Sequence, residues 1–136
     1  MDAHATCHHW LDALTKRLGM EALAPDAEGR VALRLGRHET RLVCSAELEE
    51  LFSLIRIAPL PSKDRDETIK SLSCGNYAWS GTGGGILSLD EEGWVCLTRR
   101  YPLESAEPGN FLEELAGQLV LADFWLDALE GRRELP

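Results

Sequence analysis

Residues 30–44 read RVALRLGRHETRLVC, and apolar side chains recur in them at every second position. The alternation begins at Val31 and continues through Leu42, on the far side of a turn at residues 36–38. A period of two is typical of a strand with one buried face. This stretch therefore predicts a β-hairpin whose apolar face needs a second layer to cover it.

A helix before the hairpin is the first candidate for that layer. Over residues 6–19 the apolar positions follow one another at steps of three and four, which is the spacing of one face of an amphipathic helix. Gly19 predicts the end of this helix, because glycine readily adopts the left-handed conformation found just past many helix ends. The apolar face consists of Cys7, Leu11, Leu14 and Leu18.

A longer helix is predicted near the end of the chain, over residues 110–129. Asn110 and Glu113 have the spacing of a capping box, which favours Asn110 as the N-cap. A helix of this length spans roughly 30 Å, enough to cross the domain. We expect the large side chain of Trp125 to be buried. The apolar face consists of Phe111, Leu115, Leu119, Ala122, Leu126 and Leu129, widened by Leu112, Val120 and Trp125.

Between the hairpin and the last helix the sequence predicts a third strand and a short helix. Residues 51–58 contain β-branched side chains and stop at Pro59-Leu60-Pro61, which favours a strand over the end of a helix begun at Ser45. From Ser62, a candidate N-cap, the pattern becomes helical, and it ends at Gly75-Asn76.

A glycine-rich stretch and a second hairpin follow. Residues 80–85 are predicted to be a mobile lead into a hairpin over residues 86–98. The string Asp-x-Glu-Gly precedes a strand at 26–29 and again at 90–93, where it supplies turn chemistry. The order α-β-β-β-α-β-β-α predicts a single α+β domain over residues 1–136, with a mainly antiparallel twisted sheet packed by helices.

Composition and charge limit the partners. The chain has 14 basic and 23 acidic residues and a net charge of −9, so its overall field opposes binding to nucleic acid or anionic lipid. Arg30, Arg34, Arg37 and Arg41 form a local basic cluster, which we interpret as a solvated strand face. No apolar run approaches the roughly 20 residues that cross a bilayer. We therefore expect neither a nucleic-acid nor a membrane partner.

The N-terminus and the cysteines indicate a compartment. The first residues carry neither the basic region nor the apolar core of a secretory signal, so we expect a cytoplasmic protein. In a reducing cytoplasm the cysteines at positions 7, 44, 74 and 96 are expected to be free thiols. Cys44 and Cys96 lie in apolar runs, and we interpret both as small buried side chains.

No motif predicts catalysis. His4, Cys7, His8 and His9 form a cluster in which His4 and His8 would share a helix face, but no second group lies at metal spacing elsewhere. The glycine stretch is followed by a strand, whereas a phosphate-binding loop continues into Lys-Ser/Thr and a helix. No Gly-x-Ser-x-Gly elbow and no Cys–His dyad is visible. We therefore expect no enzyme activity, no metal and no cofactor.

Several short strings have a characteristic order and spacing. They are LDALTKRLG (11–19), DAEG (26–29), VALRL (31–35), IAPLP (57–61), LSCGN (72–76), GGILSLD (84–90), GWVCL (93–97), and, in the last helix, Phe111-x-x-x-Leu115 and Phe124-Trp125-x-x-x-Leu129. Together they resemble the class I type III secretion chaperone family, typified by the Tir chaperone. The resemblance covers roughly residues 8–130, and the glycine stretch is longer than the family leads us to expect.

The resemblance implies a cytosolic homodimer that binds a secreted effector near the effector's N-terminus and consumes no nucleotide. The bound segment is expected to be extended and partly to add a strand to the sheet edge. The expected effector-binding residues are Leu14, Leu18, Leu33, Leu35 and Leu42, some of which must also belong to the core. The expected dimer-interface residues are Ile69, Leu72, Trp94 and Cys96, with an intradomain core position left open for Trp94.

Two functions of other kinds stay open at this stage. A binding module of the same fold can sequester a transcription-control protein through the same surfaces. A small enzyme can use the N-terminal His/Cys cluster, which requires metal in the purified protein. The identity of a co-purified partner separates the chaperone from the regulatory module.

Overall fold

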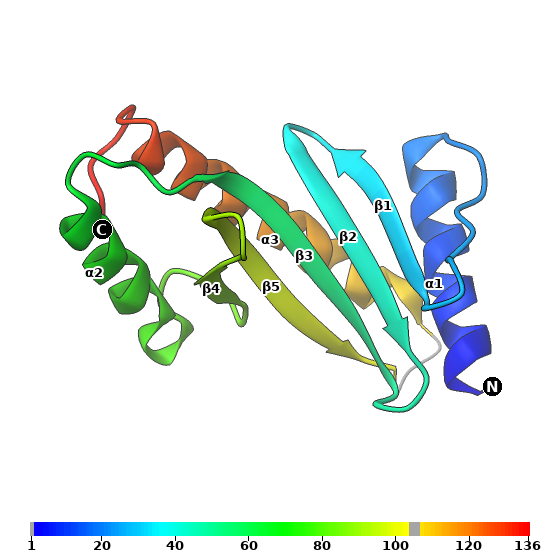
Figure 1. The fold of residues 1–136 in the computed structure, drawn as a ribbon. Coiled ribbons are helices and arrows are strands. Elements are labelled where there is room, and N and C mark those ends of the chain that lie inside the picture. Colours follow the sequence, from blue (N-terminus) through cyan, green and yellow to red (C-terminus); the bar gives the residue numbers. More distant parts are fainter. Residues whose placement is uncertain (1, 104–106) are drawn as a thin grey trace.

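The computed structural model describes residues 2–103 and 107–136 (Figure 1). The elements are α1 (Ala3–Leu18), β1 (Arg30–Leu35), β2 (His38–Ser45), β3 (Glu50–Pro59), α2 (Arg65–Asn76), the short 3₁₀ helix η1 (Tyr77–Trp79), β4 (Ile86–Leu89), β5 (Trp94–Pro102) and α3 (Pro108–Leu129). The strands form one antiparallel sheet in the order β1-β2-β3-β5-β4. This confirms the predicted α+β class and the predicted order of elements.

The first hairpin has the predicted register. Val31 of β1 lies opposite Leu42 of β2, and both side chains are buried, as a period of two requires. The stretch over residues 51–58 is the strand β3 and not a helix end, so the β-branched side chains were a sound guide. In the ladder between β3 and β5 the register shifts between Arg56 and Ala58.

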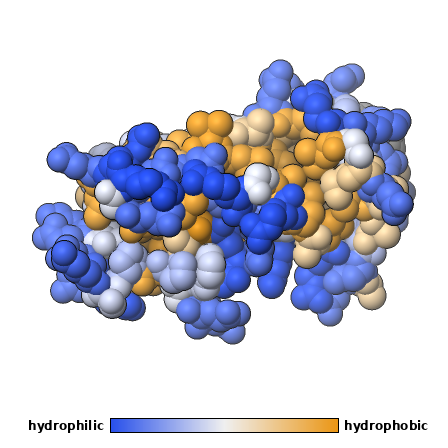
Figure 2. Space-filling view, turned by 90° about the horizontal axis from the view of Figure 1, so that it is seen from above, coloured by the Kyte–Doolittle hydropathy of each residue, from blue (hydrophilic) through white to orange (hydrophobic). Residues whose placement is uncertain are grey.

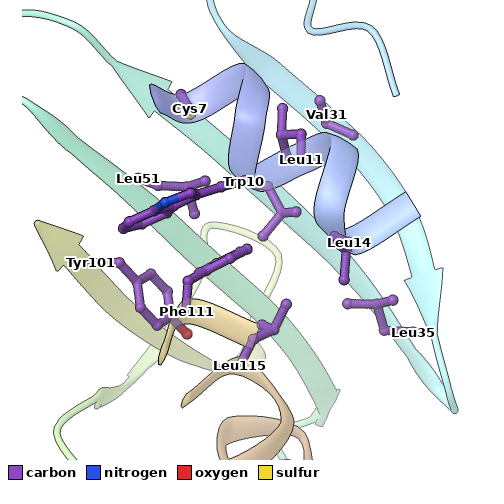
Figure 3. Close-up of a cluster of buried hydrophobic side chains, with 11 residues drawn as sticks. Cys7, Trp10, Leu11, Leu14, Val31, Leu35, Leu51, Tyr101, Phe111 and Leu115 are labelled. Carbon is purple, nitrogen blue, oxygen red and sulfur yellow. The ribbon is translucent and has the colours of Figure 1, made fainter. Parts of the chain in front are cut away.

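Helices α1 and α3 lie against one face of the sheet, and α2 lies at the end of the sheet beside β4 (Figure 1). Two groups of buried side chains fill the space between the helices and the sheet. The first lies under α1, where the Trp10 and Phe111 rings stack with centroids 5.1 Å apart and Tyr101 meets Phe111 edge-on (Figure 3). The second group surrounds Trp125 of α3. Leu119 packs against both groups, so α3 joins the two halves of the core.

The buried face of α3 differs from the predicted one. Trp125 is fully buried, as predicted, but Val120 is 69% exposed. The helix also begins at Pro108, since proline is favoured in the first turn, and Asn110 therefore lies inside the helix and is not its N-cap. The buried positions of α3 are Phe111, Leu115, Gln118, Ala122, Trp125 and Ala128.

The glycine-rich stretch is packed against α3, contrary to the expectation of a mobile lead. Thr82 is completely buried. The Nε1–H of Trp125 donates to the carbonyl of Gly81 (2.8 Å), and Nε2 of Gln118 donates to the carbonyl of Thr82 (2.7 Å). At Gly75 an added Cβ would lie 2.6 Å from the Trp125 ring. Glycine is therefore required by the close approach of the chain to the indole.

Local contacts determine where α1 and α2 start and how the two Asp-x-Glu-Gly strings fold. Helix α1 starts at Ala3, earlier than predicted, because the Asp2 carboxylate accepts the N–H of Ala5. Helix α2 starts after Asp64, so Ser62 is not its cap. Asp26 Oδ1 accepts the N–H groups of residues 28 and 30, and Asp90 Oδ1 accepts those of residues 92 and 94, all at 2.9 Å. The two strings thus form the same turn.

His38 joins the first hairpin to α3, although the sequence placed it alone in a turn. It is the first residue of β2 and is buried. Its Nε2 lies 2.7 Å from Oδ1 of Asp123 in α3, and its Nδ1 lies 3.0 Å from the carbonyl oxygen of Arg56 in β3. The side chain therefore connects two strands and the helix that covers them.

Cys7 and Cys44 form a disulfide, so the expectation of four free thiols is wrong for this pair. Their Cα atoms lie 6.2 Å apart because α1 packs across the end of β2, which brings together residues separated by 37 positions in the sequence. Cys74 is a free, exposed thiol, and Cys96 is free and buried as predicted.

Candidate functional site

Apolar side chains are exposed where α1 ends. Leu18, the last residue of α1, and Met20 are each 44% exposed, and Gly19 ends the helix in the left-handed conformation. Figure 2 shows an apolar area bordered by polar side chains over the half of the molecule that contains α1. Exposed apolar surface of this kind is a common mark of a protein-binding site.

The expected effector-binding residues lie around this area, but at different depths. Leu14, Leu35 and Leu42 are buried in the first core group, and Leu14 and Leu35 lie near one another in Figure 3. Leu33 is partly buried against the same group. Leu18 alone of the five is exposed. Within one chain, therefore, only Leu18 and Leu33 of these five are accessible from solution, and the other three pack in the core beneath.

The strand β1 gives this area an open edge. Among the described residues, no strand pairs with the side of β1 opposite β2. The carbonyl of Arg30 faces this side, because it accepts the N–H of Asp26 from the preceding turn (2.9 Å). Antiparallel strands direct alternate residues to the same side, so the backbone groups of Ala32 and Arg34 also face the open edge. An extended segment can pair with these groups.

A second set of exposed apolar side chains lies on α2, η1 and β4, at the opposite end of the sheet. Tyr77 is 80% exposed and Trp79 is 61% exposed, and both Ala78 and Trp79 have the positive φ that favours glycine. The exposed apolar residues of this end are Ile69, Tyr77, Trp79, Ile86 and Leu89. Of these residues only Ile69 was predicted from the sequence, although two aromatic residues beside a glycine-rich stretch were a usable signal.

The other expected dimer-interface residues are less accessible within one chain. Leu72 and Cys96 are buried, and Trp94 is half-buried beneath the Arg56 guanidinium, whose Cζ lies 4.1 Å from the ring centroid. Burial raises the pKa of the Cys96 thiol to about 11, so this thiol stays protonated and unreactive at neutral pH.

A surface hollow of about 320 Å³ lies beside the first turns of α1. His4 and His8 line it with their ring centroids 4.4 Å apart, and Asp26 and Cys44 line it from the other side. Nowhere in residues 2–103 and 107–136 do three His, Cys, Asp or Glu side chains gather as a metal ion would require. Because Cys7 is held in a disulfide, it is not available as a nucleophile in this state.

Most of the predicted basic cluster is paired with neighbouring carboxylates. Three of its four arginines form ion pairs, with the turn before β1, with β2 and with α3, which agrees with a solvated strand face. The pairs are Arg30–Glu28 (2.8 Å), Arg34–Glu39 (3.6 Å) and Arg37–Asp123 (3.2 Å). In the part of the chain that the structure describes, no helix is both long enough and apolar enough to cross a membrane.

The model of the Tir chaperone protein (CesT) family matches residues 9–126. Solved structures that share the fold include three complexes. The ExsC–ExsE complex has a TM-score of 0.82 at 23% identity and covers 95% of this chain and 97% of that chain. The HopA1–SchA chaperone–effector complex has a TM-score of 0.72 at 21% identity, and the match covers 90% of this chain and 94% of that chain.

The third structure is the Yersinia pestis type III secretion chaperone SycH in complex with a stable fragment of YscM2. It has a TM-score of 0.67 at 15% identity and covers 86% of this chain and 97% of that chain. At these identities the structural matches show a common fold. A comparison with curated protein sequences found no match.

Proposed function

Because the chain belongs to the Tir chaperone protein (CesT) family, we propose that it is a cytosolic chaperone that binds the N-terminal region of a secreted type III effector in extended form and keeps it soluble and competent for secretion. As a member of a chaperone family, the chain is not an enzyme. The observation that carries the proposal is the exposed apolar surface at the end of α1 beside the open edge of β1. Apolar contacts and a free backbone edge are the two requirements for binding an extended segment.

The bound segment lies along β1. Its backbone pairs with Ala32 and Arg34, and its apolar side chains contact Leu18 and Leu33, with Leu14, Leu35 and Leu42 supporting the surface from the core. Main-chain hydrogen bonds supply affinity without requiring a particular sequence, and the apolar contacts fix the register. A solved structure with the same fold is described as a chaperone–effector complex, which supports an effector as the partner.

The chaperone acts as a homodimer in this proposal. A second copy covers the exposed side chains of α2, η1 and β4, next to the expected interface residues Ile69, Leu72, Trp94 and Cys96. A two-fold interface places the same surface of each copy against the other, so apolar residues of one end of the sheet meet their own equivalents. The effector-binding surface is then free on both copies, because it lies at the other end of the sheet (Figure 1).

Purification of the tagged chain from cells that assemble a type III secretion system tests the function. We expect a secreted protein to co-purify and its isolated N-terminal fragment to bind the chain. Leu18→Glu should weaken this binding at least tenfold, whereas Leu48→Glu, at an exposed apolar residue in the β2–β3 turn, should leave it unchanged. If the co-purified protein is instead a transcription-control protein that is not secreted, the regulatory module replaces the chaperone.

A further inference from the structure

Two cysteines from distant parts of the sequence meet between α1 and β2. Cys7 lies in the core, 1% exposed, whereas Cys44 is partly exposed and lines the surface hollow beside the first turns of α1. A small molecule that enters from solution therefore meets Cys44 and not Cys7. Neither the proposed effector-binding residues nor the proposed dimer interface includes this pair.

We propose that Cys7 and Cys44 form a redox-responsive staple between α1 and β2. A small thiol of the glutathione class opens the staple, and the corresponding small disulfide closes it. The staple fixes the first half of α1 to the end of β2 when it is closed. This inference does not depend on the identity of the partner that the chain binds.

The opening reaction is two steps of thiol–disulfide exchange. The thiolate of a small thiol attacks Sγ of Cys44, the Sγ–Sγ bond breaks, and Cys7 leaves as a thiolate that takes up a proton. A second small thiolate then attacks the small-molecule sulfur of the mixed disulfide and releases Cys44 as a thiol. In total the protein disulfide gains two electrons and two protons, and two small thiols are oxidised to one disulfide. Closing is the reverse of these steps.

Opening loosens α1 without unfolding the core. The disulfide links residues 37 positions apart, and such a closure stabilises a fold mainly by restricting the unfolded chain. When the bond is open, Trp10, Leu11 and Leu14 still hold the second half of the helix in the first core group. The effect of reduction should therefore be greatest in the first turns of α1.

The two other cysteines provide controls. Cys74 is exposed and forms disulfides between molecules most easily, so Cys74→Ser removes this side reaction without touching the staple. Cys96 is buried and stays reduced, so after denaturation it should always add one alkyl group, which serves as an internal standard.

The Cys74→Ser protein is equilibrated with mixtures of reduced and oxidised glutathione, then denatured, alkylated and weighed by mass spectrometry. In oxidising mixtures we expect one alkyl group, on Cys96, and in reducing mixtures three. The melting temperature should fall by about 10 °C on reduction. Addition of Cys44→Ser should abolish this dependence. Three alkyl groups at every ratio, or a melting temperature that is the same in both states, would overturn the proposal.

Discussion

At the scale of single residues, Trp125 shows how burial and one hydrogen bond hold the last helix to the glycine-rich stretch. The indole is fully buried, and its Nε1–H donates to the carbonyl of Gly81. Trp125→Ala should lower the free energy of unfolding by about 3–5 kcal/mol, measured by denaturant titration, because it leaves a large cavity. Trp125→Phe keeps most of the apolar area and should cost less. An unchanged stability of Trp125→Ala would contradict the packing described here.

Gly75 and Gly117 are a matched pair of glycines in helices α2 and α3. A methyl group at Gly75 meets the Trp125 ring at 2.6 Å, whereas nothing lies within 4 Å of a methyl group at Gly117. Gly75→Ala should therefore destabilise the protein by about 1–3 kcal/mol through overpacking. Gly117→Ala should stabilise it by about 0.5–1 kcal/mol, because alanine favours the helix. Equal changes in the midpoint of denaturation for both variants would contradict this account.

At the scale of elements, the turns before β1 and β5 predict a loss of stability in acid. The N–H of Arg30 lowers the pKa of Asp26, and the N–H of Trp94 lowers the pKa of Asp90. A carboxyl with a lowered folded-state pKa stabilises the fold above its unfolded value of about 3.9, and this stabilisation is lost as the pH falls through the folded value. The free energy of unfolding should therefore decrease from about pH 5 to pH 3.

The variant with Asp26→Asn and Asp90→Asn checks this prediction. Asparagine keeps an oxygen that accepts the same N–H groups but does not titrate in this range. Denaturant titrations at several pH values should show a smaller decrease for the variant than for the native chain. A decrease of the same size in both proteins would show that other groups cause the acid sensitivity.

The hairpins and helices were predictable because each has its own period, whereas the helix N-caps predicted at Ser62 and Asn110 were wrong. The alternation at Val31 and Leu42 and the glycine at 19 are local properties, and the structure has both as predicted. The buried face of α3 was not fully predictable, because Leu119, Val120 and Leu121 make several helix faces equally apolar. Gln118 is buried and Val120 is exposed because of which face of α3 packs against the sheet, and this is a property of the whole fold.

The candidate sites depended more on contacts between distant segments. The disulfide could not be predicted from sequence, because Cys7 and Cys44 come together only when α1 packs across β2. Similarly, the loop at Gly81 has the composition of a flexible segment, and only the indole of Trp125 and the amide of Gln118 give it a fixed place. The leucines expected at the effector surface come together around α1, β1 and β2, but spacing alone did not indicate which of them are exposed.

At the scale of the whole molecule, the apolar end formed by α2, η1 and β4 predicts self-association. Light scattering of the chain alone should give about twice 15.1 kDa. Ile86→Glu should produce a monomer at micromolar concentration, because it places a charge on the covered surface. Val120→Glu, at an exposed apolar residue of α3, should leave the dimer intact. A native chain that is monomeric at micromolar concentrations would contradict the proposed homodimer.

Hydrogen exchange shows where the effector is bound. The exchange of backbone amides is compared for the chain alone and for its complex with the N-terminal fragment of the co-purified secreted protein. Protection by the fragment should concentrate in residues 10–45, which contain the second half of α1 and the hairpin of β1 and β2. Protection confined to residues 62–100 would place the effector on α2 and the second hairpin and contradict the account.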